Sequence, residues 1–363
     1  MIPFGDLKRQ YLSIKEEINN AIKEVLEKGW YVLGQELENF ENKFAEYCGK
    51  KFCCGVGNGT QALELALKGS DLGPGDEVIT VPNTSPFTVI AILNCGAKPV
   101  FIDCKEDYLI DVDKIESVIT KKTKAIVPVH LYGQVCEMDI ILDIAKRHNL
   151  YIIEDCCQAH GARYKGKIVP IGDIGCFSFY PSKNLGAFGD GGAIVSNNEK
   201  FIEKMRILRN GGQKIRDKVQ FIGINSRLDE IQATILNAKL KYLEKWNRRR
   251  REIARLYNSL LKGVVRIPEE EHENRHVYHL YVIRTEKRDL LMNYLRDKNI
   301  DTGIHYPIAL HLQEAYRFLG YKKGDFPNTE KYSREILSLP CFPELKDEEI
   351  EEVGKKIREF FED

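Results

Sequence analysis

The stretch VITVPNTSPFTVIAILNCGAKPVFID, residues 78–103, decides the fold class. It contains two apolar runs of strand length, 78–81 and 99–103, and the segment between them, 84–94, has the pattern of a helix. Short apolar strands that alternate with helices are typical of a mostly parallel sheet covered on both faces. We therefore predict an α/β fold, and we expect ligands at the carboxyl ends of the strands.

The same alternation continues on the C-terminal side of this stretch. Further apolar runs of strand length lie at 125–129 and 150–153, and further helical patterns at 113–119 and 138–148. After about residue 240 the pattern of predicted strands and helices changes. A long charged helix at 242–261 is followed by a smaller region with a strand near 279–284. We therefore predict a large domain over 1–240 and a smaller C-terminal domain over 241–363.

The long charged helix contains four consecutive arginines at 248–251. Such a run could hold a phosphate, but on a polar helix it is more often a solvated face. We therefore expect these arginines to face solvent.

Composition excludes several classes of partner. The 363 residues carry 54 basic and 54 acidic side chains, so the chain has no net field to attract nucleic acid or an anionic membrane. No run approaches the roughly 20 nearly unbroken apolar residues of a membrane span, and the N-terminus does not resemble a signal peptide. The ten cysteines contain no C-x-x-C pair, which argues against a metal site and for a cytoplasmic protein.

Three segments carry candidate chemistry, and the first is a glycine turn. Gly57, Asn58, Gly59 and Thr60 follow an apolar run and precede a helical pattern at 61–67. Glycines let the backbone approach an anion, and a helix start offers unpaired N–H groups. Taken alone, a glycine turn before a helix is more often only a turn.

The second segment is the end of the apolar run at 150–153, where Glu154 and Asp155 follow directly. A carboxylate at a strand end could pair with a cationic heterocycle or with a metal, but a metal needs more convergent ligands than this segment shows. His160, a little further on, could be an acid–base group, although a structurally satisfied histidine is the commoner case.

The third segment places Lys183 in a turn between two apolar runs, with Ser178 shortly before it and several glycines after it. A partly desolvated lysine has a lowered pKa and can act as a nucleophile. Together the three segments match the needs of pyridoxal 5′-phosphate (PLP). The helix start takes the phosphate, Asp155 keeps the pyridine nitrogen protonated, and Lys183 binds the aldehyde.

At this point the sequence resembles a known family, the DegT/StrS-type sugar-nucleotide aminotransferases within the aspartate aminotransferase fold, and the resemblance covers nearly the whole chain. The motifs that carry it, in order, lie at 29–34, 57–60, 130–134, 154–161, 177–192, 225–229 and 305–307. The resemblance implies a PLP-dependent transferase of fold type I, with a mostly parallel seven-stranded sheet and a smaller C-terminal α+β domain.

It also implies roles for single residues. Lys183 forms the Schiff base and moves the proton, Asp155 pairs with the pyridinium nitrogen, and Gln158 contacts the ring hydroxyl. The phosphate is held by Gly59, Thr60 and Ser178, and by Asn225 from a partner subunit.

Two further groups of residues follow from the resemblance. His305 and Tyr306 are expected near the sugar. The family usually has an aromatic residue after the equivalent of Thr84 that stacks on the cofactor, but this chain has Ser85 there. Phe87 is our candidate for that role.

The chain resembles in particular the enzymes that aminate C3 of dTDP-3-keto-6-deoxyhexoses. This implies L-glutamate as amino donor, a dTDP-keto sugar as acceptor and a homodimer with shared active sites. Amination at C4 of a 4-keto sugar stays open, as does a PLP-dependent sugar dehydratase, although relatives that dehydrate have histidine in place of Lys183. A non-catalytic PLP-binding regulator is an alternative from another class, and regulators of this kind usually carry a separate DNA-binding module.

Overall fold

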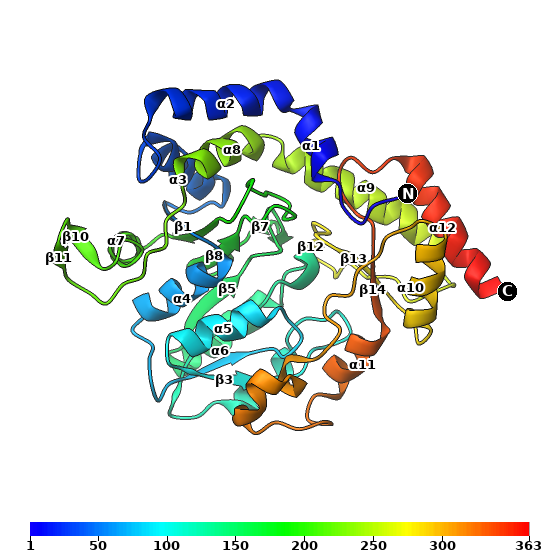
Figure 1. Cartoon of the computed structure of the whole chain (residues 1–363). Helices are drawn as coiled ribbons and strands as arrows, with labels where there is room; N and C mark the ends of the chain where they lie inside the picture. Colours follow the sequence, from blue (N-terminus) through cyan, green and yellow to red (C-terminus); the bar gives the residue numbers. More distant parts are fainter. Residues whose placement is uncertain (363) are drawn as a thin grey trace.

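The computed structural model describes residues 1–362, and its centre is a seven-stranded sheet of order β1-β9-β8-β5-β4-β2-β3 (Figure 1). The strands are β1 (Phe52–Val56), β2 (Glu77–Thr80), β3 (Lys98–Phe101), β4 (Thr123–Ile126), β5 (Tyr151–Asp155), β8 (Ile174–Ser178) and β9 (Gly192–Ser196). Strand β9 runs antiparallel to both of its neighbours, and all the others run in one direction. The predicted mostly parallel α/β sheet is confirmed.

Alternating side chains of the strands build two apolar layers, one on each face of the sheet. Ile79 packs on the face covered by α3 (Gln35–Tyr47) and α6 (Met138–His148). Its neighbour Val78 packs on the opposite face. That face is covered by α4 (Gly59–Gly69), α5 (Pro86–Asn94) and α7 (Glu199–Leu208).

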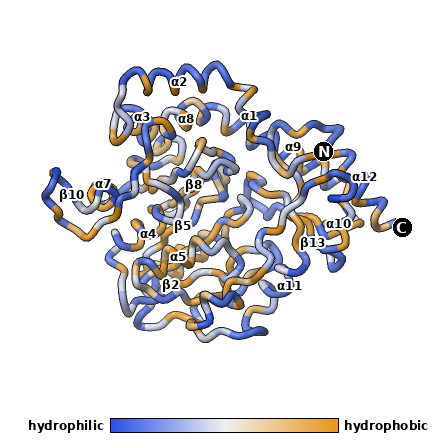
Figure 2. Tube along the Cα trace, in the orientation of Figure 1, coloured by the Kyte–Doolittle hydropathy of each residue, from blue (hydrophilic) through white to orange (hydrophobic). Residues whose placement is uncertain are grey.

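Figure 2 shows the resulting concentration of hydrophobic residues along β2, β5 and α5. Each fully buried aliphatic side chain contributes about 1.5–3 kcal/mol to folding. Burial on both faces therefore explains why these strands are nearly continuous apolar runs.

The remaining helices of the first 240 residues form an outer layer (Figure 1). They are α1 (Leu7–Ser13), α2 (Lys15–Lys28) and α8 (Glu230–Leu240). Ile18 of α2 packs with Ile235 of α8 and with Trp246 at the start of the next helix. Two small sheets lie outside the main sheet. One has three strands, β6 (Arg163–Tyr164), β7 (Lys167–Ile168) and β12 (Asn274–Arg275), and the other has two, β10 (Gln213–Ile215) and β11 (Lys218–Val219).

The C-terminal region has its own apolar cluster, in which helices pack on one antiparallel strand pair (Figure 1). The strands are β13 (Tyr281–Arg284) and β14 (Ile336–Leu339), and the helices are α9 (Leu243–Leu261), α10 (Arg288–Asp297) and α12 (Asp347–Glu362). Helix α11 (Pro327–Glu335) instead joins the apolar cluster of the main sheet through Tyr332. The first residues of the chain join this region, because Ile2 forms a parallel bridge with Ile300.

Two expectations from the sequence are wrong. The helix predicted at 113–119 is a pair of 3₁₀ turns, η1 (Val112–Lys114) and η2 (Glu116–Val118), because the β-branched residues crowded there disfavour a longer α-helix. The arginine run is only partly a solvated face, because Arg248 alone of the four is exposed. Arg250 is buried and donates to the carbonyl oxygens of Tyr278 and His279 at 3.1 Å each, so it ties α9 to the segment before β13.

The strand directions bring the chemistry to one edge. Because β1, β2, β4, β5 and β8 point the same way, the segments that follow them meet at the carboxyl edge of the sheet. Among the described residues, no helix has the length and apolar character needed to cross a bilayer.

Candidate active site

A cavity of about 920 Å³ opens at the carboxyl edge of the sheet. Nine of the ten predicted site residues line it: Gly59, Thr60, Phe87, Asp155, Gln158, Ser178, Lys183, His305 and Tyr306. The tenth, Asn225, is exposed and does not line it, and its backbone forms a bridge with Asn210. The structure therefore gathers the predicted residues except the one that the resemblance assigned to a partner subunit.

The glycine turn after β1 begins helix α4 at the cavity. Asn58 caps the helix, since its side chain accepts a hydrogen bond from the Gln61 backbone N–H at 2.9 Å. A Cβ atom on Gly59 would lie 2.7 Å from the Ser178 Cβ and 2.8 Å from the Cys157 Sγ, so only glycine fits there. The first N–H groups of α4 thus meet Ser178 in a tight cradle suited to an anion.

Asp155 ends β5 with its carboxylate fixed by two donors. The Thr88 hydroxyl donates to Oδ2 at 2.7 Å, and the Cys157 backbone N–H donates to Oδ1 at 3.1 Å. Thr88 belongs to α5, whose start lies beside the cavity. The carboxylate therefore has a set orientation and keeps a lone pair on each oxygen for a cationic partner.

Gln158 and Tyr306 connect the two regions of the chain. The Gln158 side-chain oxygen accepts from the Tyr132 backbone N–H at 2.7 Å, and its Nε2 donates to the Tyr306 hydroxyl at 3.2 Å. The Tyr306 hydroxyl also interacts with the Ser85 side chain. Burial raises the pKa of Tyr306 to about 12, so its hydroxyl stays protonated. Tyr306 thus reaches the position where the family pattern expects an aromatic ring.

Lys183 lies in the turn after β8, where its backbone N–H donates to the Tyr180 carbonyl at 2.8 Å. The turn is tight enough that a Cβ on Gly186 would overlap the Pro181 carbonyl. Burial lowers the pKa of Lys183 below its ordinary value, and nearby Cys157 and Asp155 oppose that shift. A larger share of this amine is therefore unprotonated at neutral pH than for a surface lysine.

Two histidines beside Lys183 are held neutral. Burial, with the positive charge of Lys183, lowers the pKa of His305 to about 4 and that of His160 to about 3. His305 also contacts the Ser338 hydroxyl at 2.9 Å and stacks on Phe4. His160 lies against the rings of Phe177 and Phe179, away from the cavity lining.

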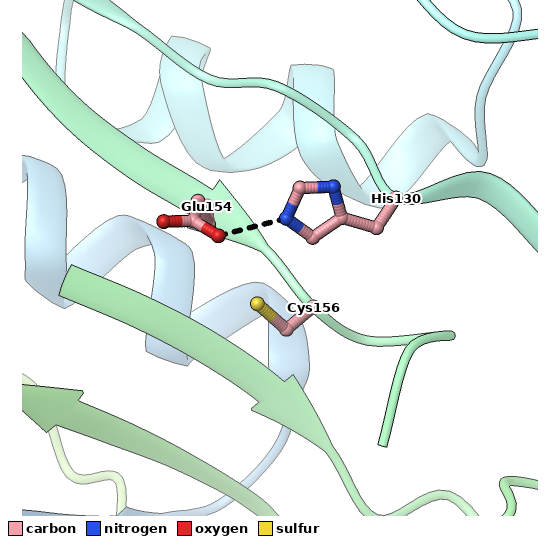
Figure 3. Close-up of side chains that lie close together, drawn as sticks. All are labelled: His130, Glu154 and Cys156. Atoms are coloured by element: carbon pink, nitrogen blue, oxygen red, sulfur yellow. Dashed lines mark hydrogen bonds and ion pairs between the residues drawn. The ribbon is translucent and has the colours of Figure 1, made fainter. Parts of the chain in front are cut away.

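A second cluster of side chains lies directly beside this site, and Figure 3 shows it. His130, Glu154 and Cys156 place possible metal-ligand atoms within 4.8 Å of one another. However, His130 Nε2 is 2.8 Å from Glu154 Oε2, and His130 Nδ1 accepts from the Cys136 backbone N–H at 3.2 Å. Both ring nitrogens are thus engaged in hydrogen bonds, so the geometry is that of a buried hydrogen-bonded cluster.

Both oxygens of Glu154 are engaged as well. It accepts hydrogen bonds from the backbone N–H groups of Ile171 and Gly172 in addition to the bond from His130. Burial raises the pKa of the Cys156 thiol well above its ordinary value, so the thiol is protonated in this apolar setting.

Sequence reasoning missed several residues of the cavity wall. Thr88 could have been found, because it lies four residues after Thr84 at the start of a helical pattern. Cys157 is the one cysteine that is not fully buried, but an adjacent cysteine pair gives no sign of which thiol faces a cavity. The N-terminal segment at 3–7 also lines the cavity, and its distance in sequence from the other residues hides this.

The arrangement fits PLP. The cradle at Gly59 suits a phosphate, Asp155 offers fixed anionic oxygens, and Lys183 offers an amine of depressed basicity. An aldehyde, a pyridine nitrogen and a phosphate ester need these three groups on one cavity wall.

Comparison with known proteins agrees with this chemistry. Residues 12–358 match the model of the DegT/DnrJ/EryC1/StrS aminotransferase family. The chain is 47% identical to a dTDP-3-amino-3,6-dideoxy-alpha-D-galactopyranose transaminase of Aneurinibacillus thermoaerophilus over 99% of each chain. It is also 44% identical to a protein of Geobacillus stearothermophilus named pleiotropic regulatory protein, over 99% of this chain and 98% of the relative.

Solved structures give the same result. The crystal structure of DesV from S. venezuelae in complex with a ketimine intermediate has a TM-score of 0.98 and 43% identity, covering 100% of this chain and 99% of that one. The structure of NtdA from Bacillus subtilis with bound cofactor PMP has a TM-score of 0.93 and 34% identity, covering 100% and 85%. The chain therefore belongs to the DegT/DnrJ/EryC1/StrS aminotransferase family and is a PLP-dependent aminotransferase.

Proposed function

We propose that this aminotransferase transfers the amino group of L-glutamate to C3 of a dTDP-linked 3-keto-6-deoxyhexose, a step in deoxyamino sugar biosynthesis. The observation that carries the proposal is the meeting of Lys183, Asp155 and the start of α4 on one cavity wall. The choice of sugar is supported by the relative at 47% identity, whose name specifies a 3-amino-3,6-dideoxy sugar.

Each part of the cofactor has a residue on the wall. Gly59, Thr60 and Ser178 would hold the phosphate, Asp155 the ring nitrogen and Gln158 the ring hydroxyl. PLP supplies an aldehyde that takes up an amino group, and a cationic ring that stabilises the negative charge left when a neighbouring C–H bond breaks.

The chain's own residues supply the proton transfers. Lys183 has a pKa lowered by burial, so at neutral pH its Nζ can take a proton from a carbon acid and return it to a neighbouring carbon. Asp155, which the Thr88 hydroxyl holds in place, would keep the ring nitrogen protonated through its opposite charge. These two roles require Lys183 and Asp155 to face the same cavity, and both residues line it at the carboxyl edge of the sheet.

The sugar would lie against the part of the cavity that the C-terminal region forms. His305, which is neutral, and Tyr306 line it, together with the N-terminal segment at 3–7. A cavity of about 920 Å³ is at the upper end of the range for small-molecule sites, which suits a nucleotide-linked sugar.

We further propose a homodimer with shared active sites. Asn225 lies outside the cavity of its own protomer, in an exposed position from which it could complete the phosphate site of a partner. Large apolar side chains are exposed nearby in sequence and at the family motif 29–34, with Ile222 95% and Trp30 64% exposed. Burial of such side chains against a second copy would be favourable.

Mixed subunits test this arrangement. If Lys183 of one subunit and Asn225 of the other form one site, each heterodimer of Lys183→Ala and Asn225→Ala subunits has one intact site. Random exchange of equal amounts should then give about one quarter of wild-type activity, since about half of the dimers are mixed. Activity no higher than that of Asn225→Ala alone would contradict the shared site.

Substrate choice is tested with a panel assay. Purified enzyme is given L-glutamate and keto sugars that differ in ketone position, C4 configuration and nucleotide, and release of the keto acid is measured. We expect turnover with dTDP-linked 3-keto-6-deoxyhexoses. Acceptance of only 4-keto sugars would overturn the C3 assignment, and water loss in place of amine transfer would indicate a dehydratase.

The name of the Geobacillus relative makes a regulator the second candidate. A regulator that binds PLP without turnover would release no keto acid with any sugar in the panel.

For the chain as a whole we propose a cofactor-binding domain at 1–240 and a smaller domain at 241–363. We also propose a cytoplasmic location, which suits ten free thiols.

A further inference from the structure

The Thr88 hydroxyl is a side-chain donor to the Asp155 carboxylate. Its Oγ1 lies 2.7 Å from Asp155 Oδ2, and the side chain is buried. An ionised carboxylate can only accept, so the Thr88 hydroxyl proton points at Asp155.

The direction of this bond fixes the next one. Thr84 Oγ1 lies 3.3 Å from Thr88 Oγ1, and Thr84 is also buried. Because the single proton of Thr88 is already donated, Thr84 must be the donor in that contact. The two hydroxyls therefore form a chain that runs from Thr84 through Thr88 to Asp155, and bonds aligned in this way strengthen one another.

The chain of hydroxyls lies on a rigid support. Thr88 is in α5, whose first turn carries Pro86, and the Ser85 side chain caps the helix start. On the other side, the Cys157 backbone N–H holds Asp155 Oδ1 at 3.1 Å. One donor on each oxygen sets the plane of the carboxylate.

We propose that Thr88 is a positioning residue of the aminotransferase reaction: its hydroxyl, oriented by Thr84, fixes the Asp155 carboxylate and limits the strength of that carboxylate as a base. This inference rests on the proposed function, in which Asp155 pairs with the ring nitrogen of PLP. With the Thr88 bond in place, the shared proton stays on the ring nitrogen. Without it, the carboxylate is a stronger base and draws that proton toward itself, so the ring carries less positive charge.

The variants that test this remove one oxygen at a time. Thr88→Val keeps the shape and loses the hydroxyl, Thr88→Ser restores the hydroxyl, and Thr84→Val removes only the second bond. Thr80→Val is the matched control, because the Thr80 hydroxyl is equally buried and donates to the Val127 carbonyl at 3.0 Å, outside the cavity lining.

Three readouts are compared with wild type: the affinity of the apoprotein for PLP, the pH midpoint of the visible absorption of the bound cofactor, and kcat with KM. A hydrogen bond to a charged group is worth at least a factor of about ten, so Thr88→Val should bind PLP about tenfold more weakly. Its kcat should fall about tenfold while KM for the sugar stays within about twofold. When the ring is less positive, the Lys183 nitrogen loses its proton only at a higher pH. The midpoint of the absorption change should therefore move to higher pH.

Thr88→Ser should recover most of the wild-type values, and Thr84→Val should shift the midpoint in the same direction by less. Thr80→Val should lower only the thermal stability. An unchanged PLP affinity and absorption midpoint in Thr88→Val would overturn the inference, as would a midpoint shift of equal size in Thr80→Val. If the wild-type enzyme still turns over in that case, the proposed function is unaffected. A wild-type protein that neither binds PLP nor releases keto acid would overturn both.

Discussion

Glu154 and Asp155 are neighbours on strand β5, yet their surroundings are opposite. Glu154 is fully buried, and its oxygens accept from His130 and from two backbone N–H groups. Asp155 lines the cavity and receives one donor on each oxygen. Two adjacent carboxylates thus point to opposite sides of one strand, one into a closed cluster and the other into an open site.

The difference shows that access to the cavity, more than residue type, separates a structural carboxylate from a functional one. A carboxylate that is fully buried among three protein donors is out of reach of a ligand. A carboxylate with a spare lone pair on each oxygen is oriented for a cation that the protein itself does not provide. The comparison predicts which substitutions remove activity and which remove stability.

The largest effect is expected at the open site, in Lys183→Ala. In the proposed function, loss of this amine removes both the covalent anchor of the cofactor and the proton-transfer group, each worth orders of magnitude in rate. We expect no measurable release of keto acid, with thermal stability of the apoprotein at or above wild type, because a desolvated amine is lost. Wild-type turnover in this variant would refute the assignment of the site.

The two neighbouring carboxylates should then separate cleanly. Asp155→Ala should lower kcat at least about 100-fold, as loss of an electrostatic partner does, and should cost less stability than Glu154→Ala, because fewer backbone donors lose their acceptor. Glu154→Ala should cost about 3 kcal/mol of stability, because three donors lose their acceptor, while the folded fraction stays active. Urea unfolding and turnover are measured on both, and the reverse pattern would contradict the comparison.

The folding stability should also depend on pH through the buried His160. His160 has a pKa lowered to about 3, so the unfolded chain takes up a proton below about pH 6.5 and the folded chain does not. Stability due to the neutral ring is therefore complete above pH 6.5 and falls by about 1.4 kcal/mol per pH unit down to about pH 3.

His160→Asn should flatten this slope by about one proton in urea unfolding series between pH 7 and pH 5. The buried His276, whose pKa is also lowered to about 3, stays in the variant and keeps part of the slope. An unchanged slope would mean that His160 is charged in the folded protein.

The smallest effect is expected at the rim of the open site. Phe87 is 57% exposed, so Phe87→Ala should weaken PLP binding only about threefold, within the range for one aromatic contact. Tyr306→Ala removes both the buried ring and the hydroxyl bonded to Gln158. An apoprotein titration that finds no change for Phe87→Ala and a clear loss for Tyr306→Ala would assign the stacking role to Tyr306.

Much of this could be predicted from the sequence because apolar runs and helical patterns are local. The runs at 78–81 and 99–103 became neighbouring strands, and the sheet then brought the residues after β1, β5 and β8 together. The family motifs named nine of the cavity residues in advance.

The rest depends on distant contacts that leave no local pattern. Arg250 donates to the carbonyl oxygens of Tyr278 and His279, which are distant in sequence. The run of charges alone therefore looked like a solvated face. The choice between Glu154 and Asp155 needs the position of His130, and the reach of Tyr306 to Gln158 crosses 148 residues.

The central claim is tested most directly by reduction of the PLP-loaded protein with borohydride, followed by peptide mapping. The chain offers an internal competitor in Lys239, a buried lysine with a pKa lowered to about 8 that donates to the Gly186 carbonyl. We predict that the reduced cofactor is found on Lys183 and not on Lys239. A label on Lys239, or no labelled lysine after incubation with excess PLP, would contradict the account.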